Sequence, residues 1–177
     1  MAGTITCPLP QNINPLSPNG FRFNILKLPG VSFFAQSVNL PGISLGEPEF
    51  ANPFSKQPIP GESLTFDQLQ VQFIIDEDMA NYLSIHNWII ALGFPQNYEQ
   101  YAKFIAESDK LATTELAKNY SDAILQILGS NNQPVQTVQF VDMFPISIET
   151  LVFDSRNTDV HYLVGNVIFK FGYYKFI

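Results

Sequence analysis

Residues that could do chemistry are few in this chain. Asp76, Glu77 and Asp78 form the one cluster of carboxylates. Adjacent carboxylates can bind a metal ion or exchange protons with a substrate, but no histidine or further acid stands at a ligand spacing from these three. A helical pattern begins directly after them. We therefore interpret them as capping residues, because negative charge stabilises the N-terminus of a helix.

The remaining reactive side chains are His86, His161 and Cys7. His86 falls within an apolar helical sector, which favours a packing role, and His161 has no partner for a catalytic triad. A lone cysteine cannot form an internal disulfide. The sequence also lacks a Gly-rich phosphate loop, a nucleophile elbow and a Cys/His metal set. We expect no catalytic residue, no cofactor and no metal, and hence a protein that is not an enzyme.

Composition narrows the class of partner. Only 14% of residues are charged, 16 are Phe, and the net charge is −7. Because there is no basic cluster, direct nucleic-acid binding is not expected. Because there is no long apolar run and no leader pattern, insertion into a membrane is not expected either. Few charges and many aromatic residues suit a protein that covers its surface with other protein. An ordinary aromatic-rich β-domain fits the composition about equally well.

The final third of the chain predicts a long strand. Leu163, Val167, Phe169, Phe171 and Tyr173 alternate with polar or small residues, a period typical of a strand with one buried face. We predict a strand of about fifteen residues over 160–174. A shorter strand over 146–153 and a polar link over 154–159 complete a large antiparallel hairpin.

Alternation also marks earlier strands. It predicts a first strand with Phe21, Phe23 and Ile25 on one face, a turn at residues 28–30, and a second strand that begins at Val31, Phe33 and Ala35. The Pro-rich residues 43–60 predict a long extended loop or a broken edge strand. Residues 61–75 predict an inner strand whose alternation slips at Asp67-Gln68, which a bulge would explain. Two further strands are expected over 123–128 and 135–144.

One helix is predicted over 79–92, ending at Gly93 and Pro95. Its apolar sector is wider than one sheet would cover, so the helix either plugs a barrel or packs on a second subunit. The polar strip is narrow. The apolar sector contains Tyr82, Leu83, Ile85, His86, Trp88, Ile89, Ile90 and Leu92, and the strip Asn81, Ser84, Asn87 and Ala91.

These patterns predict a mainly β fold, an antiparallel β-barrel or sandwich with one flanking α-helix and a partly helical insertion. Residues 1–19 are expected to form a Pro-rich extended arm, and 20–177 a single domain with a charged insertion at about 95–121. The side chains expected at a subunit interface are Tyr82, His86, Trp88, Ile90, Phe169, Phe171 and Tyr173.

The order of these pieces resembles the tail-tube protein family of contractile-tailed (T4-like) bacteriophages, together with related tube-initiator, adaptor and secretion-tube ring proteins. The resemblance covers residues 20–95 and 120–177. It rests on the strand 21–26, Leu40-Pro41-Gly42, the segment 61–67, Asp76-Glu77 before a helix with Trp88, Met143-Phe144-Pro145, Glu149-Thr150-Leu151, Asp154 and the aromatic final strand.

The resemblance implies a structural virion protein whose copies form hexameric rings that stack into the inner tail tube. It implies a location in the phage tail, and in the host cytoplasm during assembly. The implied partners are further copies, adjacent tube or baseplate rings, the tail sheath, and phage DNA that passes without specific binding. Six copies at −7 each would carry −42, and such a ring would repel DNA. A baseplate initiator, an adaptor, a tail-terminator ring and a type VI secretion-like tube remain alternatives, as does a small-ligand-binding β-barrel.

Overall fold

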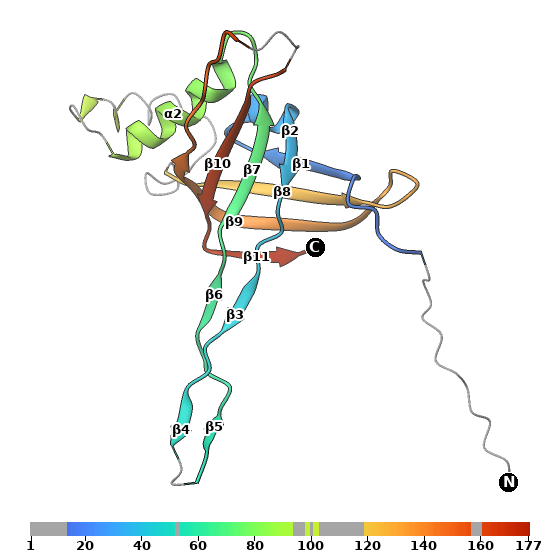
Figure 1. Ribbon diagram of the computed structural model, residues 1–177, viewed down its shortest axis with the longest axis vertical. Helices are drawn as coiled ribbons and strands as arrows, with labels where there is room; N and C mark the ends of the chain where they lie inside the picture. The colour runs from blue at the N-terminus through green and yellow to red at the C-terminus, as the bar shows by residue number, and fades with distance from the viewer. Residues whose placement is uncertain (1–13, 52–53, 94–97, 100, 103–118, 157–160) are drawn as a thin grey trace, which may run out of the picture.

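The computed structural model describes residues 14–51, 54–93, 98–99, 101–102, 119–156 and 161–177 (Figure 1). Most of the predicted N-terminal arm and of the predicted insertion at 95–121 lies outside these ranges, so the expectations for both stay predictions. The helices are α1 (Pro29–Phe33) and α2 (Ala80–Gly93). The strands are β1 (Phe21–Ile25), β2 (Ala35–Val38), β3 (Ile43–Leu45), β4 (Glu49–Ala51), β5 (Lys56–Pro58), β6 (Leu64–Phe66), β7 (Leu69–Ile74), β8 (Ser121–Leu128), β9 (Pro134–Ile148), β10 (Val164–Lys170) and β11 (Tyr173–Phe176).

The domain is built on one antiparallel sheet that bends along β9. The strand order is β1-β8-β9-β10-β7-β2, and β11 also pairs with β9. Residues 138–141 of β9 lie between β8 and β11, whereas residues 144–148 pair with β10. β7 and β10 therefore cross β8 and β9 at a steep angle (Figure 1), as in orthogonal sheet packing. The mainly antiparallel β fold predicted from the sequence is confirmed.

The core lies between the two parts of this sheet. The alternation predicted from the sequence determines which side chains enter it. Leu69, Val71 and Phe73 on β7 are fully buried, while Gln70 and Gln72 between them are exposed. Val167 and Phe169 continue the same layer on β10. Burying one face of each strand fixes the register, because a slip by one residue would move every apolar side chain into water.

The phase slip at Asp67-Gln68 is not a bulge within one strand. It separates β6 from β7, and β6 pairs only with β3 in a two-stranded ladder outside the main sheet. Leu64 on β6 is 59% exposed, whereas Leu69 on β7 is fully buried. Residues 61–75 therefore begin in the exposed β3–β6 ladder and continue into the core. The phase slip marks the boundary between the ladder and the core strand β7.

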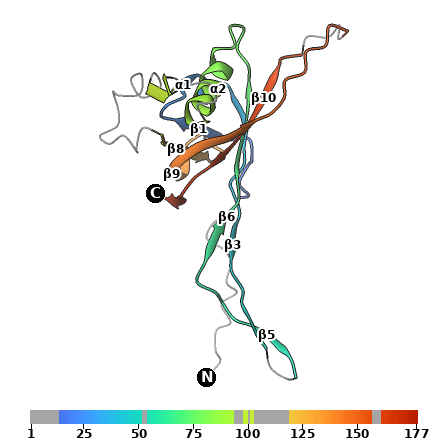
Figure 2. The same cartoon turned by 90° about the vertical axis from the view of Figure 1, so that its left-hand side faces the viewer.

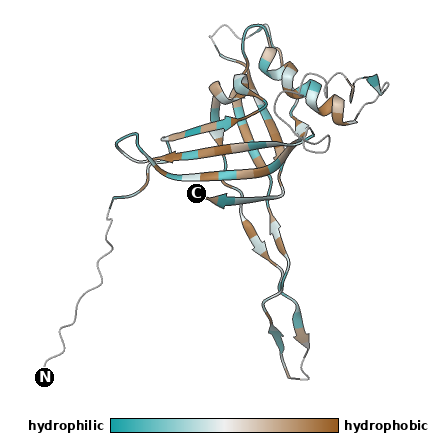
Figure 3. Ribbon diagram, turned by 180° about the vertical axis from the view of Figure 1, so that it is seen from behind, coloured by the Kyte–Doolittle hydropathy of each residue, from teal (hydrophilic) through white to brown (hydrophobic). Residues whose placement is uncertain are grey.

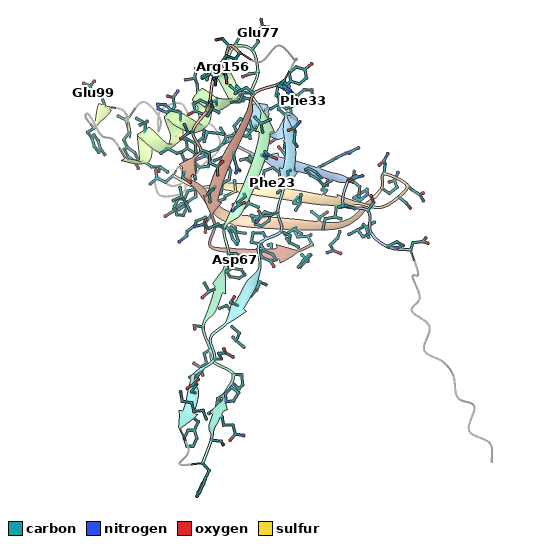
Figure 4. All side chains as sticks on the ribbon, in the orientation of Figure 1. Phe23, Phe33, Asp67, Glu77, Glu99 and Arg156 are labelled. Atoms are coloured by element: carbon teal, nitrogen blue, oxygen red, sulfur yellow. The ribbon has the colours of Figure 1, made fainter. Side chains whose placement is uncertain are left out.

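The predicted second strand is wrong at its beginning. Residues 29–33 form the short helix α1, with Pro29 in its first turn. The Ser32 hydroxyl accepts a hydrogen bond from the Ile25 backbone N–H (2.7 Å) and donates one to the Leu28 carbonyl (3.2 Å). The first of these bonds holds α1 against the end of β1, and β2 begins only at Ala35. Phe33, predicted to lie in the second strand, is instead in α1 and is 82% exposed (Figure 4).

The predicted strand over 160–174 is in fact two strands on different parts of the sheet. β10 ends at Lys170, and β11 pairs with β9 through Tyr173↔Val141. The Gly172 N–H donates to the Val141 carbonyl (3.0 Å), which fixes the change of direction. The antiparallel pairing of β9 with β10 confirms a hairpin near the chain end, but β9 stops at Ile148 instead of reaching Phe153.

Helix α2 is confirmed, but its buried face differs from the prediction. The buried residues are Asn81, Ile85, Trp88 and Ala91, so two members of the predicted polar strip face the core. Asn81 is accommodated because its amide donates to the Ile74 carbonyl (2.8 Å). On the other side Leu83 is 48% exposed and His86 is exposed, so His86 is not a packing residue within the chain.

Candidate assembly surface

The most prominent feature of the molecular surface is a hairpin, described over residues 43–51 and 54–66, that extends from the domain along its long axis (Figures 1 and 2). β3 pairs with β6 near the domain, and β4 pairs with β5 toward the tip. We call this segment the projecting hairpin. The sequence predicted extended structure here because four prolines disfavour a helix. The structure shows that the two halves of the segment pair with each other.

One face of the β3–β6 ladder is apolar. Ile43 lies opposite Phe66, and Leu45 lies opposite Leu64, so these four side chains share one face. Ile43, Leu45 and Leu64 are 52%, 51% and 59% exposed. Both strands of this ladder carry brown, hydrophobic bands in Figure 3. A continuous apolar face on an isolated two-stranded ladder leaves hydrophobic area in water and marks an interaction site.

The apolar surface continues toward the tip. Phe50 on β4 is 60% exposed, Phe54 is 94% exposed, and Ile59 is 44% exposed. Lys56 and Glu49 form an ion pair of 2.7 Å across this end. Because both side chains are largely in water, the pair contributes little to stability. The tip therefore exposes aromatic rings that no described part of the chain covers.

Close backbone contact holds the two ladders of the hairpin in line. The Gly61 N–H donates to the Gly46 carbonyl (2.7 Å), and the Gly46 N–H donates to the Ser63 carbonyl (2.8 Å). A methyl group on Gly61 would overlap the Gly46 carbonyl oxygen and lie 2.9 Å from Cδ of Pro48. Glycine is therefore required at residue 61 by the approach of the opposite strand.

The predicted interface residues do not form one patch. Trp88 and Phe169 are buried in the core with ring centroids 6.4 Å apart, so neither side chain has surface available to a second subunit. Tyr82, Ile90 and Phe171 are half-buried. His86 on α2 and Tyr173 on β11 are exposed and stay predicted interface residues.

Sequence reasoning missed Ile43, Leu45 and Leu64 as surface residues. The available signal was two short apolar alternations, at 43–45 and 64–66, that flank a Pro-rich stretch of low charge. Such a pattern is consistent with a hairpin that has an apolar face. Reading the second alternation as part of an inner strand placed it in the core instead.

The groups with possible chemistry have structural roles where the structure describes them. The Asp76 carboxylate accepts the backbone N–H of Asn81 (3.4 Å), which confirms the capping interpretation for this residue. Glu77 lies exposed at the far end of the molecule from the projecting hairpin (Figure 4). Within the described ranges, no group of three His, Cys, Asp or Glu side chains could hold a metal ion. None of the described helices is long and apolar enough to cross a membrane.

Two charged groups have shifted pKa values. Half-burial lowers the pKa of Lys27 to about 8. The Nζ atom lies 5.2 Å from the centre of the Trp88 ring, a contact that favours the charged amine and so opposes the effect of burial. On the surface, two side-chain hydrogen bonds from Arg156 (2.8 and 2.9 Å) lower the pKa of Asp154.

Comparison with known proteins identifies the fold. No family model and no curated protein matches the sequence. A chain of the anti-feeding prophage baseplate, solved by cryo-electron microscopy with sixfold symmetrisation, matches with a TM-score of 0.58 and 10% identity over 93% of this chain and 96% of that one. A chain of the tube-terminating cap of the anti-feeding prophage matches with a TM-score of 0.58 and 12% identity over 99% of both chains. A chain of the sheath-tube complex of an extracellular contractile injection system matches with a TM-score of 0.53 and 14% identity over 93% of both.

Proposed function

We propose that this chain is a structural, non-enzymatic subunit whose copies form hexameric rings that stack into the inner tube of a contractile phage tail or a related injection apparatus. The projecting hairpin is the main support for this proposal, because the residues that the structure describes leave its apolar face uncovered. The shared fold with tube, cap and baseplate assemblies suggests that further copies provide the cover.

Self-association through the hairpin has a simple geometric consequence. The hairpin of one copy would bind a different surface of the next, and such head-to-tail contacts produce closed rings or open stacks. Side-by-side copies could also pair the free edges of β1, β2 and β11, because an unpaired edge readily accepts another strand. His86 and Tyr173 would lie at these contacts, and the N-terminal arm would lie along a neighbouring copy.

The negative charge of the ring would allow DNA to pass through the tube. Six copies carry −42 by formal count, and a lumen without a basic cluster would repel phosphate. The genome could then pass without binding. The sheath would surround the outer face of the tube.

Electron microscopy and analytical ultracentrifugation of the purified protein test the proposal. Rings or tubes of uniform diameter are expected at high protein concentration. A sedimentation coefficient that stays at the value of one subunit up to that concentration would overturn it.

A terminal ring is the second candidate. The cap structure of the anti-feeding prophage covers 99% of this chain and 99% of its own, a fuller overlap than the baseplate and sheath-tube structures have. The same microscopy separates the candidates. A plain tube subunit forms long tubes on its own, whereas a terminal, initiator or adaptor ring stops after one or a few layers.

A further inference from the structure

A cluster of aromatic rings joins the base of the projecting hairpin to the opposite part of the sheet. Phe66 ends β6, Phe140 lies on β9, Phe171 follows β10, and Tyr174 lies on β11. The ring centroids are 5.5 Å apart for Phe66–Tyr174, 5.7 Å for Phe66–Phe171 and 5.2 Å for Phe140–Phe171. These separations are typical of favourable aromatic pairs. We call these four residues the root cluster.

Tyr174 contacts both strands of the hairpin where they leave the domain. Its hydroxyl donates a hydrogen bond to the carbonyl of Pro41 (3.2 Å), two residues before β3. Its ring packs on Phe66, the last residue of β6. Pro41 is buried and Phe66 is half-buried. One side chain therefore links the entry and the exit of the hairpin to β11.

The other hydrogen bonds described at the base connect the chain entering the hairpin to the chain leaving it. The Asn39 side chain donates to the Gln68 carbonyl (3.0 Å) and accepts the Gln70 N–H (2.6 Å). The Asp67 N–H donates to the Gly42 carbonyl (3.0 Å), and Figure 4 shows Asp67 where the hairpin leaves the domain. These bonds keep the strands paired, but they do not set the angle between the hairpin and the sheet of β8, β9 and β11.

The strand that carries Tyr174 is itself well anchored. Tyr174 lies opposite Phe140 of β9. The Gly172 N–H donates to the Val141 carbonyl (3.0 Å), and the Ile177 N–H donates to the Thr137 carbonyl (2.9 Å). β11 is thus fixed to β9 at both ends. A contact between β11 and the hairpin consequently orients the hairpin relative to the sheet of β8, β9 and β11.

We propose that Tyr174 is a positioning residue that fixes the direction in which the projecting hairpin leaves the domain, and thereby its fit on a neighbouring copy. The first half of this inference concerns the single chain. The second half rests on the proposed function.

Distances between two spin labels test the first half. The labels are placed at Ser55, near the hairpin tip, and Ser130, in the β8–β9 turn, in the full chain with Cys7→Ser and at a dilution that gives the mass of one subunit. Both label sites are exposed. The parent protein should give one narrow distance distribution. Tyr174→Phe, which removes only the hydroxyl, should raise the fraction of displaced hairpin by about 2- to 10-fold, and Tyr174→Ala should broaden the distribution further.

Tyr173→Ala is the matched control. Tyr173 is the preceding aromatic residue of the same strand and is 48% exposed, and alternate strand residues point to opposite faces. Its removal should leave the distance distribution unchanged. Near-ultraviolet circular dichroism of each variant separates a displaced hairpin from loss of packing. If Tyr174→Ala unfolds the chain, Tyr174→Phe alone decides.

Unchanged distances in the folded Tyr174 variants, or equal broadening in Tyr173→Ala, would overturn the inference. Electron microscopy of the two Tyr174 variants tests the second half. If the distance distribution broadens but normal rings still form, the direction of the hairpin does not determine its fit on a neighbouring copy, and the second half of the inference is overturned. If the parent protein forms no rings, the proposed function fails, whereas the distance measurement still decides the role of Tyr174.

Discussion

The indole ring of Trp88 on α2 and the phenyl ring of Phe169 on β10 pack together inside the core, with centroids 6.4 Å apart at 50°. Both side chains are buried, with 1% and 0% exposed. This contact joins the helix to the sheet across the interior. Both residues were predicted to lie at a subunit interface, and their burial means that they can affect assembly only through the fold.

Replacing Phe169 should therefore destabilise the single chain. Phe169→Ala is expected to lower the free energy of unfolding by about 3–5 kcal/mol, because it leaves a cavity beside Trp88. Urea titration followed by Trp88 fluorescence measures the loss. Tyr173→Ala, at a half-exposed aromatic residue nearby, should stay within about 0.5 kcal/mol of the parent. Equal effects for the two variants would contradict this account of the core.

Polar substitutions on the apolar face of the hairpin should separate assembly from folding. The double variant Leu45→Ser/Leu64→Ser changes two largely exposed side chains, so the unfolding midpoint should barely move. Ring or tube formation should be lost, because the buried apolar area that drives association is removed. Analytical ultracentrifugation and electron microscopy measure the outcome.

The opposite face of the same ladder supplies the control for that variant. Ser44 and Thr65 lie opposite each other on the polar face and are exposed. Ser44→Ala/Thr65→Ala should assemble like the parent. Assembly that survives the leucine changes would show that this face is not an interface.

A methyl group at Gly61 should disturb the hairpin without unfolding the domain. It would overlap the Gly46 carbonyl and crowd Pro48, at a local cost of about 1–3 kcal/mol. Hydrogen exchange at the Gly46 amide should then become faster, while exchange in β7 and β10 stays slow. Gly93→Ala is a suitable control, since nothing lies within 4 Å of a Cβ at Gly93. Unchanged exchange in Gly61→Ala would contradict the predicted overlap.

The lowered pKa of Lys27 predicts a stability that rises at alkaline pH. Below pH about 8 the amine is charged in both states, and its half-burial disfavours folding. Between about 8 and 10.5, the usual value, the unfolded chain holds this proton while the folded chain releases it. The unfolded state then binds more protons, so this group increases the free energy of unfolding across that range.

Lys27→Met should remove that contribution. Urea unfolding at pH 7 and pH 9.5, in the parent and in Lys27→Met, isolates it from the other groups that titrate in the same range. The parent should gain stability relative to the variant as the pH rises. An identical pH dependence in the two proteins would show that burial does not shift this lysine.

Alternation predicted the core strands well, because burying one face of a strand requires an apolar residue at every second position. Leu69, Val71 and Phe73 follow this pattern and are all fully buried. Helix α2 was predicted from apolar side chains at helical spacing and from its ending at Gly93 and Pro95. Its buried Asn81 was not predicted, because the hydrogen bond to the Ile74 carbonyl depends on tertiary contact.

The boundaries of the long strands were harder to predict from the sequence. Alternation continues past Lys170 into Tyr173, yet the chain moves from one part of the sheet to the other between them. Phe171 and Tyr174 both pack in the root cluster, so their apolar character carries no information about which strand each belongs to. The candidate surface on Ile43, Leu45 and Leu64 was missed for a related reason. Apolar alternation looks the same whether the buried face is covered by the chain itself or by another molecule.

The continuity of the hairpin with the main sheet has a mechanical consequence. β6 leads directly into β7, and β7 is bonded along its length to β10 on one side and β2 on the other. The bonds of an antiparallel ladder lie perpendicular to the strands. A pull along the hairpin axis therefore loads these bonds together in shear, instead of opening them one after another. The main sheet therefore resists a force that acts along the projecting hairpin.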